Sequence, residues 1–342
     1  MIKNRYFWLR IQIIMTLIRK RKITLRKVAN AAYCYLAYFL RLKKSAATPY
    51  VMNFELWNEC NEACVFCRDA KGKIYDQNPE TPDGVISKGK MPLELYYKII
   101  DEVKSSLLMS IPYINGEPLI FHKLEDAIRY STQRNVATMI ASNGILLTKS
   151  RSQSLLEAGL DFIKVHVSGF TQEVHHIQHR RGNVESIKKN IRDLVEVNKT
   201  GKYGALVLID YILYQHNQHE LDKFRAFADE LGVKFNVRPG NPKGMESSEK
   251  PQTNEPLPVD LACNWLWSAM SINWDGTMMP CCEYAVSSTR SPHGKFDMNG
   301  TSLKEVWNGN KAAAMRNIHT KTGRRNIEIC SRCPRKGMAF KW

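Results

Sequence analysis

The sequence predicts an α/β protein in which six strand–helix units surround a parallel sheet, as a partial (β/α)6 barrel. Three observations support this prediction. Apolar strand-like runs alternate with helical stretches up to Pro239, the alternation then stops, and residues 1–45 carry twelve lysines and arginines but no acid. The expected segments are, in chain order, a basic amphipathic helical extension (1–48), the partial barrel (49–240), a linker (241–258) and a small C-terminal domain (259–342).

The N-terminal extension combines apolar runs with basic clusters. The run at 6–18 is followed by basic residues at 19–22, and the run at 33–40 by basic residues within 41–44. Neither run reaches the ~18–20 residues that a membrane-spanning helix needs. The pattern suits helices lying in a membrane interface beside anionic head groups, and it equally suits helices packed on the rest of the protein.

Charge and cysteine content limit the classes of protein to which this chain can belong. The chain has 50 basic and 33 acidic residues, which gives a net charge of +17. Without the twelve basic residues of the extension, 38 basic and 33 acidic residues remain, a net charge of +5. We find no nucleic-acid-binding motif, so nucleic acid would be attracted only non-specifically. The clustered cysteines indicate a reducing compartment, and no signal-peptide pattern is found. We therefore expect a cytoplasmic protein whose residues 1–45 are a candidate peripheral membrane contact.

The barrel prediction depends on the order of its elements. Strand-like runs lie at 51–57, 109–114, 137–142, 161–168, 204–212 and 234–238. Helical stretches lie at 92–106, 122–133, 149–158, 184–198 and 217–231. In parallel barrels the chemistry sits at the carboxyl ends of the strands. The segments that follow each strand are therefore where we expect functional residues.

The region after Pro239 changes character. Residues 241–258 are polar and rich in proline, which indicates a linker. In the C-terminal domain, Asp275-Gly276 lies between two short apolar runs, which is a strong signal for a β-hairpin.

Three cysteines directly follow the first strand. Cys60, Cys64 and Cys67 are spaced C-x3-C-x2-C, and no fourth cysteine lies nearby. Three thiolates on one loop suit three corners of a cubane iron–sulfur cluster and leave one iron open for a ligand. A structural zinc site is the alternative, but zinc sites usually have a second pair of ligands at short spacing.

A second group of cysteines lies in the C-terminal domain. Cys263, Cys281, Cys330 and Cys333 are enough to saturate an iron–sulfur cluster, and a four-cysteine zinc site fits the same spacing. Cys282, beside Cys281, is either a hydrogen-atom donor to a substrate radical, an alternative ligand or a packed small residue.

The first cysteine loop, including the aromatic Phe66 before its last cysteine, resembles the signature of the radical S-adenosylmethionine (SAM) enzymes. The C-terminal stretch resembles their auxiliary-cluster domain, called SPASM, in its shortened form called Twitch. Beyond the cysteines, the motifs that carry this second resemblance are Asp275-Gly276, Pro280-Cys-Cys and 303–308.

The resemblance implies SAM-binding residues after several strands. Gly116 and Glu117 lie in Asn115-Gly-Glu-Pro, where the family typically has Gly-Gly-Glu-Pro, so the first glycine is replaced here. The glycine allows close backbone approach, and the carboxylate suits the methionine ammonium. The other candidates for SAM contacts are Ser142, Asn143, Ser168 and Arg180, the last as a clamp for the SAM carboxylate. His175, His176 and His179 are interpreted as polar helix and loop residues.

The resemblance also implies an activity. Its cofactors are a SAM-binding 4Fe-4S cluster on three cysteines, an auxiliary 4Fe-4S cluster on four, and SAM; its partner is a flavodoxin- or ferredoxin-type reductant. We expect reductive cleavage of SAM to a 5′-deoxyadenosyl radical, followed by dehydrogenation or epimerisation of a small carbohydrate-type substrate. No peptide-recognition segment is evident ahead of the barrel. A peptide-modifying maturase is the alternative enzyme, and a non-catalytic zinc protein docking through its basic extension is the alternative of another class.

Overall fold

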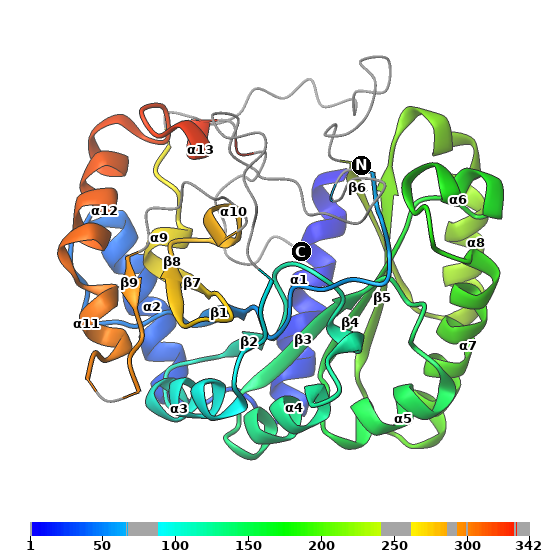
Figure 1. The fold of residues 1–342 in the computed structure, drawn as a ribbon, viewed down its shortest axis with the longest axis horizontal. Coiled ribbons are helices and arrows are strands. Elements are labelled where there is room, and N and C mark those ends of the chain that lie inside the picture. Colours follow the sequence, from blue (N-terminus) through cyan, green and yellow to red (C-terminus); the bar gives the residue numbers. More distant parts are fainter. Residues whose placement is uncertain are drawn as a thin grey trace.

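Six parallel strands form the barrel in the order in which they occur in the chain (Figure 1). They are β1 (Val51–Phe54), β2 (Met109–Ile111), β3 (Ala137–Ser142), β4 (Phe162–Val167), β5 (Leu206–Leu213) and β6 (Lys234–Pro239). The structure is a computed structural model, which describes residues 2–65, 67, 88–240, 261–285, 293–298, 300–331 and 333. Each strand lies within about two residues of its predicted start, so the predicted arrangement of six units is confirmed.

Helices connect the strands and cover one face of the sheet. They are α3 (Leu93–Val103), α4 (Leu124–Gln133), α5 (Lys149–Glu157), α6 (Gln172–Gln178), α7 (Val184–Thr200) and α8 (Leu221–Leu231), with 3-10 turns η1 (Pro118–Ile120) and η2 (Gln215–Glu220). Thr148 and Asn183 cap α5 and α7 by accepting hydrogen bonds from the backbone N–H groups of Arg151 and Ser186. Helix α6 was not expected from the sequence, because its seven residues are too short to show a clear period.

The main apolar core lies between the sheet and these helices. Alternate residues of β4 and β5, such as Val165 and Ile209, join it together with residues of α3 and α7. Since side chains alternate along a strand, the residues between them face the opposite side of the sheet. We call this opposite side the inner face.

The C-terminal domain extends the same sheet. Strand β7 (Ala269–Ile272) pairs in parallel with β1, and β8 (Thr277–Met279) and β9 (Gly294–Lys295) follow antiparallel. The hairpin predicted at Asp275-Gly276 is present, and Gly276 has the positive φ of 84° that its turn requires.

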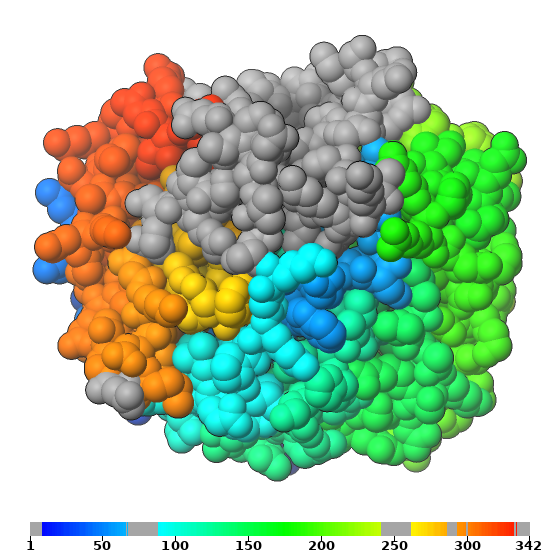
Figure 2. Space-filling model, viewed as in Figure 1, coloured from blue at the N-terminus to red at the C-terminus, as the bar shows by residue number. Residues whose placement is uncertain are grey.

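Short helices complete this domain. They are α9 (Trp265–Ser268), α10 (Cys282–Ala285), α11 (Leu303–Trp307), α12 (Asn310–Thr322) and α13 (Glu328–Ser331). Figure 2 shows the orange surface of this region meeting the cyan surface of α3. At this contact the backbone N–H of Lys304 donates to Glu102 Oε1 at 3.3 Å, and Leu303 and Trp307 join the main core. The predicted linker 241–258 lies outside the described residues.

The N-terminal extension forms α1 (Ile2–Arg19) and α2 (Leu25–Phe39), both fastened to the barrel. On the inner face, Ile13 and Leu17 of α1 pack with Met139 and Phe162, and α1 lies behind the strands in Figure 1. Beyond α1, the Lys20 Nζ atom is 3.1 Å from a carboxylate oxygen of Asp161. Packing on the barrel, one of the two interpretations of the extension, is therefore observed. No helix among the described residues is long and apolar enough to cross a membrane.

Candidate active site at the carboxyl ends of the barrel strands

The first cysteine group forms one tight loop after β1. None of the three cysteines forms a disulfide. The loop is shaped by its own hydrogen bonds: Cys67 N–H donates to the Cys64 carbonyl at 2.9 Å, and Glu62 N–H lies 3.4 Å from the Cys60 Sγ atom. Phe66 lies outside the described residues. The loop thus presents three sulfur ligands at the strand end where the sequence predicts chemistry.

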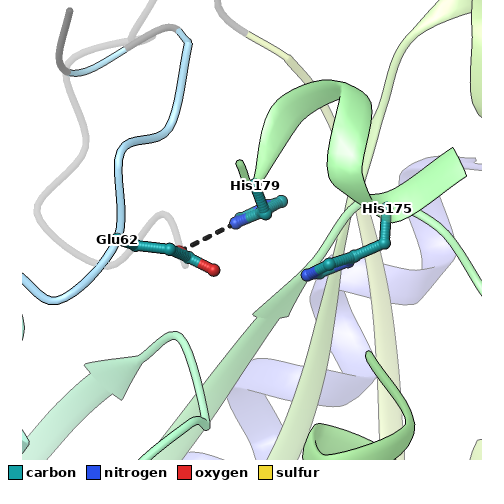
Figure 3. Close-up of side chains that lie close together, drawn as sticks. All are labelled: Glu62, His175 and His179. Atoms are coloured by element: carbon teal, nitrogen blue, oxygen red, sulfur yellow. Dashed lines mark hydrogen bonds and ion pairs between the residues drawn. The ribbon is translucent and has the colours of Figure 1, made fainter. Parts of the chain in front are cut away.

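Cys64 is surrounded by two polar side chains. Its thiol lies 3.1 Å from Glu62 Oε2 and 3.4 Å from His179 Nδ1, and these two residues contact each other at 2.9 Å, as Figure 3 shows. Burial, and then the Glu62 carboxylate, raise the pKa of Cys64 well above its ordinary value. A thiol must lose its proton to bind iron, and Glu62 is positioned to accept that proton.

His175 stacks on His179 from one turn earlier in α6, with ring centroids 4.4 Å apart. Its two nitrogens have no hydrogen-bond partner among the described residues, and burial lowers its pKa to about 2. Glu62, His175 and His179 bring ligand atoms within 4.8 Å of one another, which is close enough to hold a metal ion. Two of the three, however, already contact Cys64, so we interpret them as a polar shell around that ligand.

From sequence the histidines were interpreted as polar helix and loop residues, and His175 and His176 do lie in α6, with His179 at its C-terminal cap. The sequence did not indicate that two of them are buried beside Cys64. His175 and His179 are buried, whereas His176 is exposed. The spacing of His175 and His179 could have indicated this, since residues four apart lie on one face of a helix. Glu62, inside the cysteine loop, was missed because a loop glutamate is usually solvated.

Ser168 and Arg180 take different positions near this shell. The Ser168 hydroxyl lies 2.9 Å from His179 Nε2, and its residue is fully buried. Arg180 follows directly after His179 and is half-buried. Among the described residues Arg180 forms no ion pair, so its guanidinium is available to a ligand.

Glu117 connects the segments after β2 and β3. Its Oε1 accepts hydrogen bonds from the Ser142 hydroxyl at 2.8 Å and the Leu119 N–H at 3.0 Å, and its Oε2 accepts from the Asn143 N–H at 2.8 Å. Burial raises the pKa of Glu117 to about 7, although these three donors oppose the rise. Glu117, Ser142 and Asn143, which the sequence places in separate motifs, therefore form one hydrogen-bonded group.

This group reaches the cysteine loop through two contacts. Asn143 Nδ2 donates to Asn61 Oδ1 at 2.8 Å and lies 3.9 Å from Cys60 Sγ. Gly116 has a φ of +83°, and a Cβ atom added there would lie 2.3 Å from the Glu59 carbonyl oxygen. Only glycine permits this approach of the two backbones. The predicted SAM-binding residues thus lie directly beside the predicted cluster ligands.

The second cysteine group also comes together in the structure. Burial, and then the neighbouring Cys282, Cys330 and Cys263, raise the pKa of Cys281 well above its ordinary value. Burial, followed by Cys263 and Cys333, raises the pKa of Cys330 to about 12. Cys263, Cys281 and Cys282 pack against one apolar cluster, and Cys281 and Cys330 pack against a second, so these cysteines lie in one region. Bound iron would offset the repulsion among their thiolates.

The donor chemistry of both groups fits iron–sulfur clusters. Each group offers sulfur ligands free of disulfides, three on the loop after β1 and four in the C-terminal domain. Cys282 opens α10 beside Cys281 and is half-buried, so the structure places it against the second group. His319 Nδ1 accepts a hydrogen bond from the Cys263 N–H at 3.1 Å, which orients that ligand.

Comparisons with known proteins agree with this geometry. A family model of the radical SAM superfamily matches residues 54–228, about half of the chain, and the SPASM model, an iron–sulfur cluster-binding domain, matches residues 263–334. These matches decide against the non-catalytic zinc alternative. They imply SAM, a 4Fe-4S cluster and an auxiliary cluster as cofactors, and the cysteines to hold them are present.

Individual relatives give the same result. The chain is 25% identical over 199 residues to mycofactocin maturase MftC of Mycobacterium ulcerans (strain Agy99), covering 57% of this chain and 48% of MftC. It therefore spans about half the length of the curated relatives it matches first.

Solved structures share the fold. Streptococcus suis SuiB bound to S-adenosylmethionine has a TM-score of 0.62 at 13% identity, covering 83% of this chain and 71% of SuiB. BtrN in complex with AdoMet and 2-DOIA has a TM-score of 0.51 at 16% identity, covering 84% of this chain and 94% of BtrN. The chain belongs to the radical SAM superfamily and carries a C-terminal SPASM domain.

Proposed function

We propose that this radical SAM enzyme oxidises or epimerises a small carbohydrate-type substrate with the help of an auxiliary cluster. When bound, SAM at the cluster of Cys60, Cys64 and Cys67 supplies a 5′-deoxyadenosyl radical for hydrogen abstraction. The observation that carries the proposal is the pairing of this three-cysteine loop with a second, four-cysteine group. A second cluster offers an acceptor for the electron that a substrate radical loses in dehydrogenation.

The surrounding residues have the chemistry for orienting SAM. The Gly116 backbone and the Glu117 carboxylate suit the methionine ammonium, and Arg180 suits the carboxylate. Ser142, Asn143 and Phe66 complete the proposed contacts, and Ser168 acts through His179. For epimerisation, the Cys282 thiol would return a hydrogen atom to the substrate radical. The one-electron donor we propose is a flavodoxin- or ferredoxin-type protein, in the reducing cytoplasm.

The first test is iron and sulfide content of anaerobically reconstituted protein beside a variant with Cys60, Cys64 and Cys67 all changed to Ala. About eight irons, falling to about four in the variant, support two four-iron clusters. About four irons in wild type and none in the variant would show that the auxiliary cluster is absent, which would remove the argument for oxidation. Turnover of candidate substrates with Cys282→Ala then separates the reactions, since epimerisation needs the thiol and dehydrogenation does not.

Peptide modification is the second candidate function. It is favoured by the likeness to the maturase MftC over 199 residues. Incubation with SAM, reductant and peptide or sugar libraries separates the two, because coupled formation of 5′-deoxyadenosine requires the matching substrate class.

We also propose that the extension docks on an anionic membrane surface. Most exposed large apolar side chains of the described residues belong to it: Ile14, Met15, Ile18, Leu25, Val28, Tyr33, Tyr35, Leu36, Phe39 and Leu40. Arg21, Arg26, Arg41, Lys43 and Lys44 are exposed beside them, and the extension contains no acid. Apolar side chains flanked by cations suit the interface of an anionic bilayer.

Vesicle flotation tests this contact. Deleting residues 1–45 would be an unsuitable variant, because Ile13, Leu17 and Cys34 are buried against the barrel. Leu25→Ser combined with Phe39→Ser changes two side chains that are 91% and 72% exposed. We expect wild type to float with phosphatidylglycerol-containing vesicles and the double variant to lose this. Equal flotation of both, or none by wild type, would contradict the proposal.

A further inference from the structure

The positive charge of the chain is concentrated in two segments. Residues 1–45 hold twelve basic residues and no acid, and residues 306–342 hold nine basic residues and one acid. Of the 50 basic and 33 acidic residues in all, 29 basic and 32 acidic residues are therefore left for 46–305, a net charge of −3. The proposed membrane contact accounts for the first basic segment, but it does not account for the second.

Helix α12 is the longest described element of the second segment, and it lies at the outer edge of the C-terminal domain (Figure 1). Its exposed residues Lys311, Ala314, Ile318 and Lys321 are spaced three and four apart, so they lie on one face of the helix. Neither Lys311 nor Lys321 forms an ion pair with another described residue. We call these four residues the α12 face.

The opposite side of α12 is buried against the second cysteine group. Met315 belongs to the apolar cluster against which Cys281 and Cys330 pack. His319 Nδ1 accepts the hydrogen bond from the Cys263 N–H at 3.1 Å. A helix with its side chains is about 10–12 Å across, so the α12 face lies roughly one helix diameter from the ligands of the proposed auxiliary cluster. An electron can tunnel over such a distance between a cluster and a carrier docked on this face.

The charges around α12 favour a negatively charged partner. Between Glu305 and Glu328 the sequence has five basic residues and no acid. Glu305 caps its own helix, because its carboxylate accepts a hydrogen bond from the Ser302 N–H at 2.7 Å. The buried Arg316 donates to the carbonyl oxygens of Leu266, Lys43 and Trp307 rather than to a carboxylate, so its positive charge adds to that of the exposed lysines.

The composition of the α12 face suits a protein better than a bilayer. The extension exposes ten large apolar side chains, whereas Ile318 is the one that α12 exposes among its described residues. Binding in a membrane interface needs a buried apolar face, which a single isoleucine does not provide. Two cations with one apolar residue between them instead suit the acidic surface of a soluble protein, which opposite charge steers into contact.

We propose that the α12 face docks an acidic one-electron carrier of the flavodoxin or ferredoxin type, which takes up the electron from the auxiliary cluster. This rests on the proposed function and names the electron acceptor that dehydrogenation needs. One electron moves: the auxiliary cluster is oxidised and the carrier is reduced, and a flavodoxin takes a proton from water as its flavin becomes the semiquinone. Lys311 and Lys321 hold the carrier by charge, and Ile318 provides the apolar contact between them.

Stopped-flow mixing tests this electron transfer. The donor is the full chain with Cys60, Cys64 and Cys67 all changed to Ala, so that the auxiliary cluster is its only cluster. It is reduced with dithionite and separated from excess reductant. Oxidised flavodoxin is the acceptor, and the absorbance of its semiquinone gives the rate. Cytochrome c, a basic one-electron carrier, is the acceptor of opposite charge.

Two double variants are compared in this background. Lys311→Glu with Lys321→Glu reverses the charge of the α12 face. Lys98→Glu with Lys123→Glu is the matched control, because both lysines are exposed, on α3 and at the start of α4, and the net charge falls by four in either case. Iron content and circular dichroism check that each protein retains its cluster and fold.

We expect transfer to flavodoxin to slow as salt rises and to be about tenfold slower or more at low salt in the α12 double variant, because opposite charge raises association rates by about 10- to 1,000-fold. The control variant should stay within about twofold of its parent, and cytochrome c should not react more slowly with the α12 variant. An unchanged rate in the α12 variant, equal slowing in both variants, or no semiquinone from a reduced cluster would overturn the proposal.

Vesicle flotation distinguishes a membrane from the carrier. Loss of flotation with phosphatidylglycerol-containing vesicles in the α12 variant, at an unchanged rate of electron transfer, would assign the α12 face to a membrane and overturn the proposal. Failure of the proposed function gives a different result: protein without iron in the triple-cysteine background lacks the auxiliary cluster, and both inferences then fall together. Iron present, with rates independent of Lys311 and Lys321, overturns the docking surface alone.

Discussion

The Nδ1 atom of His179 lies 3.4 Å from the Sγ atom of Cys64, and the backbones of these two residues form an isolated antiparallel bridge. This contact joins the end of α6 to the loop after β1. The other ring nitrogen is 2.9 Å from the Ser168 hydroxyl, so the imidazole is held from both sides. Hydrogen bonds to cluster sulfurs tune reduction potential and retention of iron.

We expect His179→Gln to weaken the cluster on the first cysteine loop. Partners in the second coordination shell typically change metal affinity or activity by about 10- to 100-fold. The measurement is iron content after dilution into a chelator, together with the electron paramagnetic resonance spectrum of the reduced protein. His176→Gln, on the exposed side of the same helix, is the matched control. Identical spectra and iron retention in the two variants would show that His179 does not influence the cluster.

Gly116→Ala should disrupt the same loop from the other side. The added Cβ would lie 2.3 Å from the Glu59 carbonyl oxygen, next to Cys60, so one of the two backbones must move. Gly232→Ala is the control, because Gly232 also has a positive φ but nothing lies within 4 Å of its Cβ position. In both variants the backbone strain of an alanine at positive φ should lower the unfolding free energy by about 1 kcal/mol. Only Gly116→Ala should also lose iron, and equal iron content in both would refute the steric argument.

Glu117 should make the stability of the cluster-free protein depend on pH. Its pKa is raised from 4.5 to about 7, mainly by burial. The folded protein therefore binds more protons than the unfolded chain between these values, and stability falls as pH rises through this range. Relative to Glu117→Gln, the unfolding free energy of wild type should decrease by up to about 3 kcal/mol across it. Denaturant titrations from pH 4.5 to 8 measure this; parallel pH profiles would argue against it.

Asp161 fastens the extension to the barrel. Its buried carboxylate lies 3.1 Å from Lys20 Nζ and 3.6 Å from Lys22 Nζ, and Lys22 is itself almost fully buried. Asp161→Ala leaves a buried ammonium without its counter-ion, so we expect a loss of about 3–5 kcal/mol in unfolding free energy.

The control for this prediction is Asp126→Ala, which removes an exposed ion pair with Arg129 and should cost less than about 1 kcal/mol. Chemical denaturation followed by circular dichroism compares the two. Similar small losses would mean that the extension is held by its apolar contacts alone.

Local patterns were sufficient to predict most of the barrel. The six strands and five of the helices are long enough, and regular enough in their apolar spacing, to be recognised without tertiary information. The hairpin at Asp275-Gly276 was predictable because only a few residue types permit its turn. The spacing of Cys60, Cys64 and Cys67, within eight residues of sequence, was likewise enough to predict an iron–sulfur cluster site.

Contacts between distant segments could not be predicted in this way. Nothing in the local pattern indicates that β7 pairs in parallel with β1, because pairing depends on which strand edge is free. His166, Asp210 and Asn236 lie on three different strands, and only strand register brings them side by side. A single charged residue in an apolar strand is a weak signal by itself.

The sequence by itself determined the superfamily and the order of the βα units, and it picked out the cysteines proposed as cluster ligands, because each depends on residues close together in the chain. Only the tertiary structure decided that α1 packs on the inner face, that His179 and Glu62 surround Cys64, and that Arg238 and Asn236 both donate to the buried Asp210 carboxylate. These features depend on which side chains meet across strands and helices. That is set by packing of the whole chain, which buries apolar surface and leaves the polar groups to find partners in space.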